Sequence, residues 1–114
     1  MSAEFLKTMK SRRVIRDMTD QPVEREKIEK ILDAGRWSPA AGNKRTTRFV
    51  VIQDPLTLRM VRVFSPGMFQ EPQVVILLCI DWDIVEENQF TGDDKSPYID
   101  QGVVMQTMML AAHS

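Results

Sequence analysis

The chain has 114 residues, which is enough for one domain and too few for two. Hydrophobic residues make up 43% of the sequence and the formal net charge is −1, a combination that excludes intrinsic disorder. No apolar run approaches the roughly 20 residues of a membrane span, and the first residues lack the apolar stretch of a signal peptide. The single cysteine, Cys79, excludes an internal disulfide and fits a reducing compartment. We therefore expect a cytoplasmic protein without membrane contact.

Charge is distributed unevenly along the sequence. Residues 1–62 hold 14 Lys and Arg against 8 Asp and Glu, whereas residues 63–114 hold Lys95 alone against 8 acids. The basic half could bind an anionic partner, or the two halves could neutralise each other in the fold. Nucleic acid is not the expected partner, because no aromatic residues are interleaved with the basic ones and no recognition-helix pattern is present.

The apolar spacing predicts most of the secondary structure. In chain order it predicts a helix over 3–11, an extended segment over 12–16, a helix over 24–36, a loop over 38–46, a strand over 49–52, a short helix over 56–63 and a strand over 74–80. The helix over 24–36 is the clearest, since Ile28, Ile31, Leu32 and Gly35 recur at helical spacing. The last strand is continuously apolar, so we expect it to be covered on both faces.

The end of the chain combines an acidic segment with an apolar helix. Residues 83–95 are predicted to be exposed and partly irregular, after which Ser96 as N-cap and Pro97 in the first turn open a helix. Eight of the eleven residues over 102–112 are apolar, so this helix should be central or lie at a subunit interface. It has no capping glycine, and we expect either that the chain is incomplete at its C-terminus or that a partner covers the helix.

Two arginines mark the first candidate site. On an extended segment Arg12 and Arg16 project to the same side, with Val14 between them. Two guanidinium groups on one side match a phosphate and a second acceptor nearby. The alternative is an exposed basic turn whose arginines pair with Asp17 and Asp20.

The loop over 38–43 is the second candidate site. Its sequence is Ser-Pro-Ala-Ala-Gly-Asn, and small side chains let a flat ligand approach the main chain closely. Asn43 can both donate and accept a hydrogen bond, which suits the edge of a heterocycle. The alternative is an ordinary connection between a helix and a strand. Trp37, just before this loop, is expected to be a packing residue, as is Trp82.

Both candidate sites resemble the FMN-dependent nitroreductase family. Residues 11–43 are similar to a family pattern that runs Arg-Arg-Ser-x-Arg, a turn, Val-Pro, a helix and a Trp-x-Pro-Ser-x-x-Asn loop. Residues 48–54 are similar to the strand that follows this loop in the family. Asp100-Gln101-Gly102, leading to Leu110-Ala111-Ala112-His113, resembles the central helix of the family. Order and spacing agree along nearly the whole chain.

The chain departs from that family pattern at several positions. Val14 replaces the serine between the arginines, and Ala40 replaces the serine of the loop. Where the family has Asn-x-Gln-Pro-Trp, this chain has Asn43-Lys44-Arg45-Thr46-Thr47. Family members are also roughly twice as long. These departures leave flavin binding as an expectation and leave the choice of substrate open.

The resemblance implies an α+β fold in a single nitroreductase-like domain over 1–114, with a mixed or antiparallel sheet flanked by helices. It implies an FMN-dependent oxidoreductase that passes electrons from NAD(P)H to a nitroaromatic, quinone or similar acceptor. The implied cofactor-binding residues are Arg12, Arg13, Val14, Arg16, Pro39, Ala40, Ala41 and Asn43. The protein would supply no catalytic side chain and no metal site, because the flavin carries the chemistry.

The resemblance also implies individual roles. Arg12 would bind the FMN phosphate with help from Arg13, and Arg16 would reach the polar edge of the flavin ring. The loop would approach a flavin bound mainly by the other subunit of a homodimer.

We expect that dimer to form around the last helix, whose open face would carry Val103, Met105, Met108, Met109 and Leu110. The alternative function is a non-catalytic half-domain that binds a flavin or a phosphate.

Overall fold

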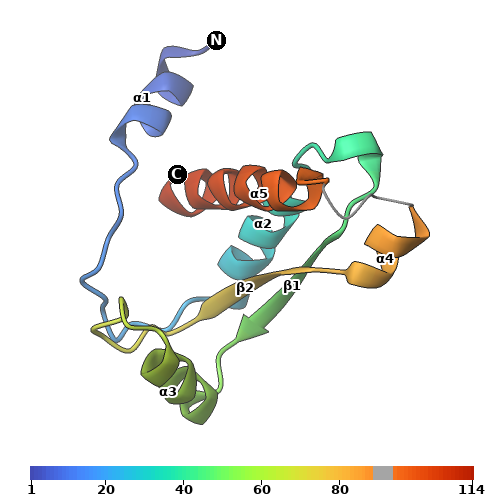
Figure 1. Ribbon diagram of the computed structural model, residues 1–114. Helices are drawn as coiled ribbons and strands as arrows, with labels where there is room; N and C mark the ends of the chain where they lie inside the picture. Colours follow the sequence, from blue (N-terminus) through green and yellow to red (C-terminus); the bar gives the residue numbers. More distant parts are fainter. Residues whose placement is uncertain (89–93) are drawn as a thin grey trace.

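The structure, a computed structural model, describes residues 1–88 and 94–114 of the chain. Its elements are α1 (Ala3–Ser11), α2 (Arg25–Arg36), the 3-10 turn η1 (Ala41–Asn43), β1 (Thr47–Ile52), α3 (Pro55–Phe64), β2 (Val75–Ile80), α4 (Trp82–Glu87) and α5 (Ser96–His113), as Figure 1 shows. Helices around a small antiparallel sheet make an α+β fold, which confirms the predicted fold class.

The sheet consists of β1 and β2, which pair antiparallel with Thr47 opposite Ile80 and Ile52 opposite Val75. Both strands are rich in β-branched residues, which favour extended backbone. Helix α3 connects them, and its N-terminus is capped by Asp54, whose Oδ2 accepts the N–H of Thr57 at 2.9 Å.

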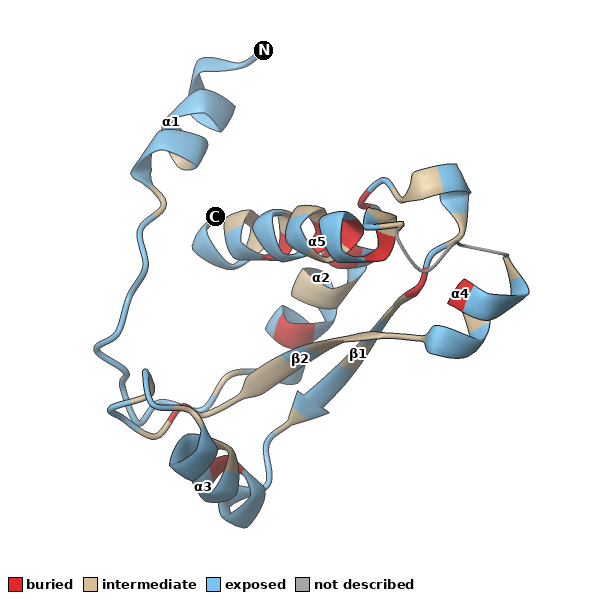
Figure 2. Ribbon diagram, in the orientation of Figure 1, coloured by how far each residue is buried: buried red, intermediate tan, exposed pale blue. Residues whose placement is uncertain are grey.

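Within residues 1–88 and 94–114, helices cover one face of the sheet. In β1, Thr47 and Phe49 are half-buried while Arg48 and Val50 are exposed, which is the alternation of a strand with one packed face. The expectation that residues 74–80 are covered on both faces is wrong for this structure, because β2 is only half-buried and Leu77 is exposed. Helix α5 packs against both strands, and Figure 2 shows the buried residues gathered around α5 and α2.

The centre of the fold is the contact between α2 and α5. Ile28 and Gly35 are the buried residues of α2, and Val104 and Met108 are buried on α5. A Cβ atom placed on Gly35 would lie 2.9 Å from Met108 Cγ and 3.1 Å from Phe49 Cζ. The two helices therefore approach as closely as they do because residue 35 has no side chain.

Helix α5 buries one stripe and exposes another. Its buried residues are Pro97, Asp100, Val104 and Met108, spaced three or four residues apart. On its outer side Ile99 is 64% exposed and Met105 is 50% exposed, which confirms that one apolar face stays open within this chain. The assignment of Met108 to that open face is wrong, because its side chain fills the space beside Gly35.

Two predictions for the acidic segment need correction. Ser96 is not the N-cap of α5, because Lys95 occupies that position and makes no side-chain capping bond. Asp94, one residue earlier, accepts the N–H of Ser96 at its Oδ1 at 2.8 Å. The segment over 83–95, predicted to be exposed and partly irregular, begins inside helix α4, which Asp81 caps through the N–H of Ile84; the prediction of exposure is wrong at Val85, which is buried. The rest of that prediction, over 89–93, lies outside the described residues.

Helix α1 stands apart from the other elements (Figure 1). It buries none of its residues and contacts the end of α5, where Ser11 Oγ lies 2.9 Å from His113 Nε2. Across the described ranges, no helix combines the length and the apolar character needed to cross a bilayer.

Candidate functional site

The predicted arginine segment begins where α1 ends. Arg12 is the C-cap of α1, and its N–H donates to the carbonyl oxygen of Thr8 at 3.2 Å. Arg13 turns back onto the helix end, where Nη1 donates to the carbonyl oxygens of Lys10 at 2.7 Å and Arg12 at 2.8 Å. Arg13 therefore caps α1, a structural contact that the sequence analysis did not foresee.

Val14 and Arg16 continue the segment as exposed residues outside any strand. Among the ion pairs of the described residues, none joins Arg12 or Arg16 to Asp17 or Asp20. The alternative of a basic turn paired with its own acids therefore has no support. Instead, Arg12 and Arg16 present positive charge that neither of these neighbouring carboxylates neutralises.

The loop after α2 contains three residues with left-handed backbone. Gly42, Asn43 and Arg45 have φ angles of 58°, 54° and 52°. Glycine and asparagine adopt this region readily, whereas an arginine there costs about 1–3 kcal/mol. The Arg45 side chain stabilises the loop, because its Nε donates to Asn43 Oδ1 at 3.0 Å and its Nη1 donates to the carbonyl oxygen of Arg36 at 2.5 Å. The loop is thus fastened to the end of α2.

A buried carboxylate fastens the loop to α5 as well. Asp100 is 8% exposed, and its Oδ1 and Oδ2 accept the N–H of Ala41 at 3.2 and 3.1 Å. Hydrogen bonds to a carboxylate are stronger than those between neutral groups. Asp100 belongs to the motif that resembles the central helix of the family, but the sequence analysis gave it no role of its own.

The start of β1 is held by further hydrogen bonds. Gln101 Nε2 donates to Thr47 Oγ1 at 3.0 Å and to the carbonyl oxygen of Cys79 at 3.3 Å. The N–H of Asp81 donates to the carbonyl oxygen of Thr46 at 2.8 Å, and Thr46 is only 1% exposed. The loop therefore runs between two fixed ends.

The structure does not bring the two predicted half-sites together within one chain. Figure 1 shows the segment after α1 running along one side toward α3, whereas η1 lies beside the start of α5. The loop residues Pro39, Ala40, Ala41 and Asn43 stay with Asp100 on that second side. This separation is compatible with the expectation that the loop serves a flavin bound mainly by a second subunit, which stays a prediction.

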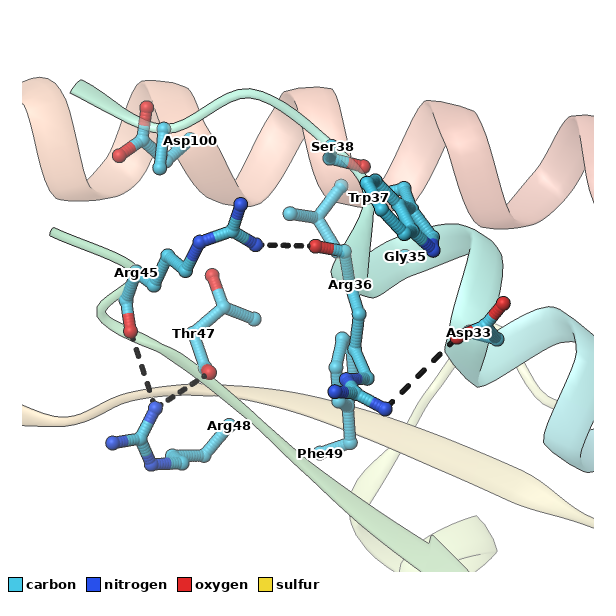
Figure 3. A pocket seen from close by; sticks show the side chains of 12 residues that line it. Asp33, Gly35, Arg36, Trp37, Ser38, Arg45, Thr47, Arg48, Phe49 and Asp100 are labelled. Atoms are coloured by element: carbon cyan, nitrogen blue, oxygen red, sulfur yellow. Dashed lines mark hydrogen bonds and ion pairs between the residues drawn. The ribbon is translucent and has the colours of Figure 1, made fainter. Parts of the chain in front are cut away.

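A cavity of about 580 Å³ opens beside the loop, between the end of α2, the start of β1 and α5 (Figure 3). It is lined by Asp33, Gly35, Arg36, Trp37, Ser38, Ala40, Arg45, Thr47, Arg48, Phe49, Asp100 and Val104. Of the eight predicted cofactor-binding residues, only Ala40 contributes to this lining. The sequence analysis therefore missed the cavity, although the departure at Arg45-Thr46-Thr47 was a signal of it.

Three arginines line this cavity and differ in their partners. Arg36 Nη1 lies 3.9 Å from Asp33 Oδ1, and Arg48 Nε lies 3.2 Å from Asp81 Oδ2. Arg45 donates to uncharged oxygens. Trp37 is 80% exposed at the cavity, so the expectation that it is a packing residue is wrong for this chain.

No group of three or more metal-ligating side chains occurs among residues 1–88 and 94–114. The side chains that characterise the site are its arginines, the small residues of the loop and the exposed ring of Trp37.

Comparison with known proteins gives consistent matches. The sequence model of the Nitroreductase family matches residues 9–74. A provisionally named NADH dehydrogenase/NAD(P)H nitroreductase of Methanothermobacter thermautotrophicus is 32% identical over 97% of this chain and 56% of its own length. An FMN reductase [NAD(P)H] of Bacillus subtilis is 26% identical over 70% of this chain and 33% of its own length.

Solved structures agree with this match. A provisionally assigned nitroreductase of Desulfovibrio desulfuricans in complex with FMN has a TM-score of 0.85 and 28% identity, covering 99% of this chain and 64% of that one. An FMN-dependent nitroreductase of Clostridium difficile has a TM-score of 0.77 and 27% identity, covering 95% of this chain and 60% of that one. The chain spans about half the length of two curated relatives that it matches.

Proposed function

Because the chain belongs to the nitroreductase family, we propose that it forms the FMN-binding part of an oxidoreductase that uses NAD(P)H to reduce a nitroaromatic, quinone or similar small molecule. The observation that carries the proposal is the anchored loop over 39–43, in a fold shared with a protein that binds FMN. Its small residues leave the main chain open to a flat ring, and Asp100 fixes their position.

The residues present fit the chemical groups of FMN. A phosphate needs cationic donors, and neither Asp17 nor Asp20 competes for Arg12 and Arg16. Arg12 would hold the phosphate, and Arg16 would supply positive charge at the polar edge of the ring. Arg13 would contribute charge while it keeps its capping bonds to α1. When bound, FMN would supply the electron-transfer chemistry.

The proposal includes assembly with a second copy of the chain. Within one chain the arginine segment and the loop lie on different sides, so a site that uses both needs residues of two chains. The exposed face of α5 offers a contact surface, because Ile99 and Met105 are apolar and exposed there. The space beside Gly102 is open, since a Cβ at that position would meet no atom within 4 Å, so a second chain can approach the helix closely. Burial of each such apolar side chain stabilises an interface by roughly 1.5–3 kcal/mol.

An FMN titration of the purified chain tests the proposal. Replacing Arg12 by Ala should weaken FMN binding by roughly 1.5–3 kcal/mol, the range for a hydrogen bond to a charged group. Arg12→Lys should recover part of this loss, since it keeps the charge but not the planar fork. The matched control is Arg25→Ala, which removes an arginine whose side chain is 90% exposed and pairs with Glu29.

The outcomes separate the candidate functions. No FMN binding, or equal binding by wild type and Arg12→Ala, would reject the proposed site. Binding of FMN without oxidation of NAD(P)H would favour the alternative, a non-catalytic flavin-binding half-domain. Sedimentation of the same samples at low micromolar concentration should show a dimer, and a monomer that still holds FMN would reject the shared site.

A further inference from the structure

We propose that the cavity between α2, β1 and α5 binds a planar aromatic carboxylate, and that Arg45 recognises its carboxylate group. The proposal goes beyond FMN binding, because Arg45 and Trp37 are not among the residues expected to hold the flavin. It rests on the charge, the space and the exposed ring that these residues provide.

Arg45 is the arginine of the cavity lining that has no carboxylate partner among the described residues, and it has spare hydrogen-bond donors. A guanidinium group has five N–H donors, and the described bonds of Arg45 to Asn43 and Arg36 use two of them. Among the residues described, it forms no ion pair with a carboxylate, whereas Arg36 faces Asp33 and Arg48 faces Asp81. Figure 3 shows Arg45 reaching across the cavity toward the main chain of Arg36.

The acids of the cavity are already engaged. Asp100 accepts the N–H of Ala41 with both oxygens, and Asp33 lies beside Arg36. Arg45 is therefore free to attract an anion in the space between them. Its two bonds to the protein hold the head group in place, so little conformational entropy is lost when a ligand carboxylate binds.

The remaining lining suits a flat aromatic body. Trp37 is 80% exposed and lines the cavity together with Phe49, so a ring can stack on an indole that nothing else in the described chain covers. Ser38 is 5% exposed and its Oγ has no hydrogen-bond partner there. This hydroxyl is shielded from the cavity, so it is not among the groups that would contact a ligand.

Two lining residues of this cavity differ from the family pattern. Arg45 stands at the position of the pattern's Gln, and Thr47 stands at the position of its Trp. The first change replaces a neutral amide by a cation, and the second replaces an indole by a small side chain. Arg45 also adopts a positive φ, a backbone state that an arginine keeps only where its surroundings enforce it.

The cavity is adjacent to the proposed flavin site. Ala40 lines the cavity and belongs to the loop expected to approach the flavin ring. A bound aromatic acid would thus lie beside that ring, and it would accept electrons there only where the acid also carries a reducible group such as a nitro group, because reduced FMN does not reduce a carboxylate. Its role as acceptor rests on the proposed function, whereas its binding does not.

Calorimetric titration of the full chain at low salt, without FMN, tests the binding. The probes are benzoate and benzamide, which have the same shape but differ in charge. We expect benzoate to bind at least tenfold more tightly, and Arg45→Gln to bring the two affinities together. The matched control Arg59→Gln, on α3 and away from the cavity, should keep the preference. Equal affinities in the wild type, no binding of benzoate, or a preference that survives Arg45→Gln would overturn the proposal.

Two further variants keep the test decisive if Arg45→Gln does not fold. Thr47→Trp should weaken both probes at least tenfold while Arg45 stays in place, because the indole fills the cavity. In Trp82→Phe, Trp37 is the only tryptophan, and its fluorescence should change with the same dissociation constant as the heat signal. Unchanged binding in Thr47→Trp, or an unresponsive Trp37, would place benzoate elsewhere. A chain that binds benzoate but not FMN would reject the proposed function and leave this proposal standing.

Discussion

The two candidate half-sites differ in how firmly the chain holds them. The loop over 39–46 is fixed at three points. Asp100 on α5 accepts the N–H of Ala41, the Arg45 side chain bonds the carbonyl oxygen of Arg36 at the end of α2, and the main chains of Thr46 and Asp81 are hydrogen-bonded. The segment over 12–16 is exposed for most of its length and is fixed at its start by the capping bonds of α1.

Under the proposed function, one chain would therefore preorganise the loop half of the binding site and leave the arginine half loosely held. The loop has a defined geometry without any ligand, because Asp100, the carbonyl oxygen of Arg36 and the N–H of Asp81 hold it. The arginine segment has charge but few contacts, so its arginines depend on a ligand or another chain to fix their positions. Preorganised groups bind with less entropic loss, and we expect the loop to contribute specificity while the arginines contribute charge.

The largest expected effect comes from removing the carboxylate that anchors the loop. Asp100→Ala leaves the N–H of Ala41 without its acceptor and should lower the free energy of unfolding by about 2–3 kcal/mol. Asp100→Asn keeps an acceptor and should cost less. Urea unfolding measures both, with Asp17→Ala, in the exposed segment, as the control that stays within about 0.5 kcal/mol of wild type. Equal losses in Asp100→Ala and Asp17→Ala would remove the contrast between the two regions.

A smaller effect is expected from the glycines of the helix pair that positions the loop. Gly35→Ala should destabilise by about 1 kcal/mol or more, because overpacking against Met108 and Phe49 exceeds the gain in helix propensity. Gly102→Ala meets open space and should stabilise by up to about 1 kcal/mol. Thermal unfolding of both variants measures these changes in stability. A gain at Gly35 would show that the α2–α5 contact is loose, and a loss at Gly102 would contradict the open space there.

The smallest expected effect is an acid-dependent loss of the hydrogen bonds that Asp54 and Asp94 accept at the starts of α3 and α5. Hydrogen bonds from the side chain and the N–H of Ser96 lower the pKa of Asp94, assisted by the charge of Lys44. Hydrogen bonds from the side chain and the N–H of Thr57 likewise lower the pKa of Asp54 below its ordinary value of 3.8.

The direction of the pH dependence follows from these shifts. A carboxylate whose pKa is lower in the folded chain than in the unfolded chain stabilises the fold at pH values above its pKa in the unfolded chain. This stabilisation is lost as the pH falls through the pKa of the folded chain. Unfolding at pH 7 and at pH 3 should therefore show smaller acid losses in Asp94→Asn and Asp54→Asn than in the wild type. If each variant loses as much stability in acid as the wild type, other carboxyls cause the acid dependence.

Local patterns in the sequence predicted most of the fold. Helix α2 begins one residue later than predicted and ends where predicted, because its apolar spacing and the following Ser38-Pro39 are local signals. The cap of α5 was misplaced because Ser96 is a common capping residue, whereas the position actually taken by Lys95 depends on the turn that precedes the helix. The covering of β2 could not be predicted, since it depends on which elements lie over each face of the sheet.

The candidate site was less predictable than the fold. Asp100 and Ala41 are 59 positions apart, so no local pattern connects the carboxylate to the loop. The contact of Arg13 with the end of α1 depends on a side-chain rotamer that many arginines could adopt. The cavity at Arg45 and Thr47 was visible only as a departure from a family pattern, and its meaning required the position of Trp37.

The two-stranded sheet described above has a consequence for how the fold can grow. Within the described residues β1 and β2 pair only with each other, so each strand keeps one edge without a neighbouring strand. Alternate residues along such an edge direct their N–H and C=O groups outward, and these rows are templates for another strand. Strands added at either edge would widen the sheet laterally and inherit its register, while the contact between Gly35 and Met108 would remain as it is.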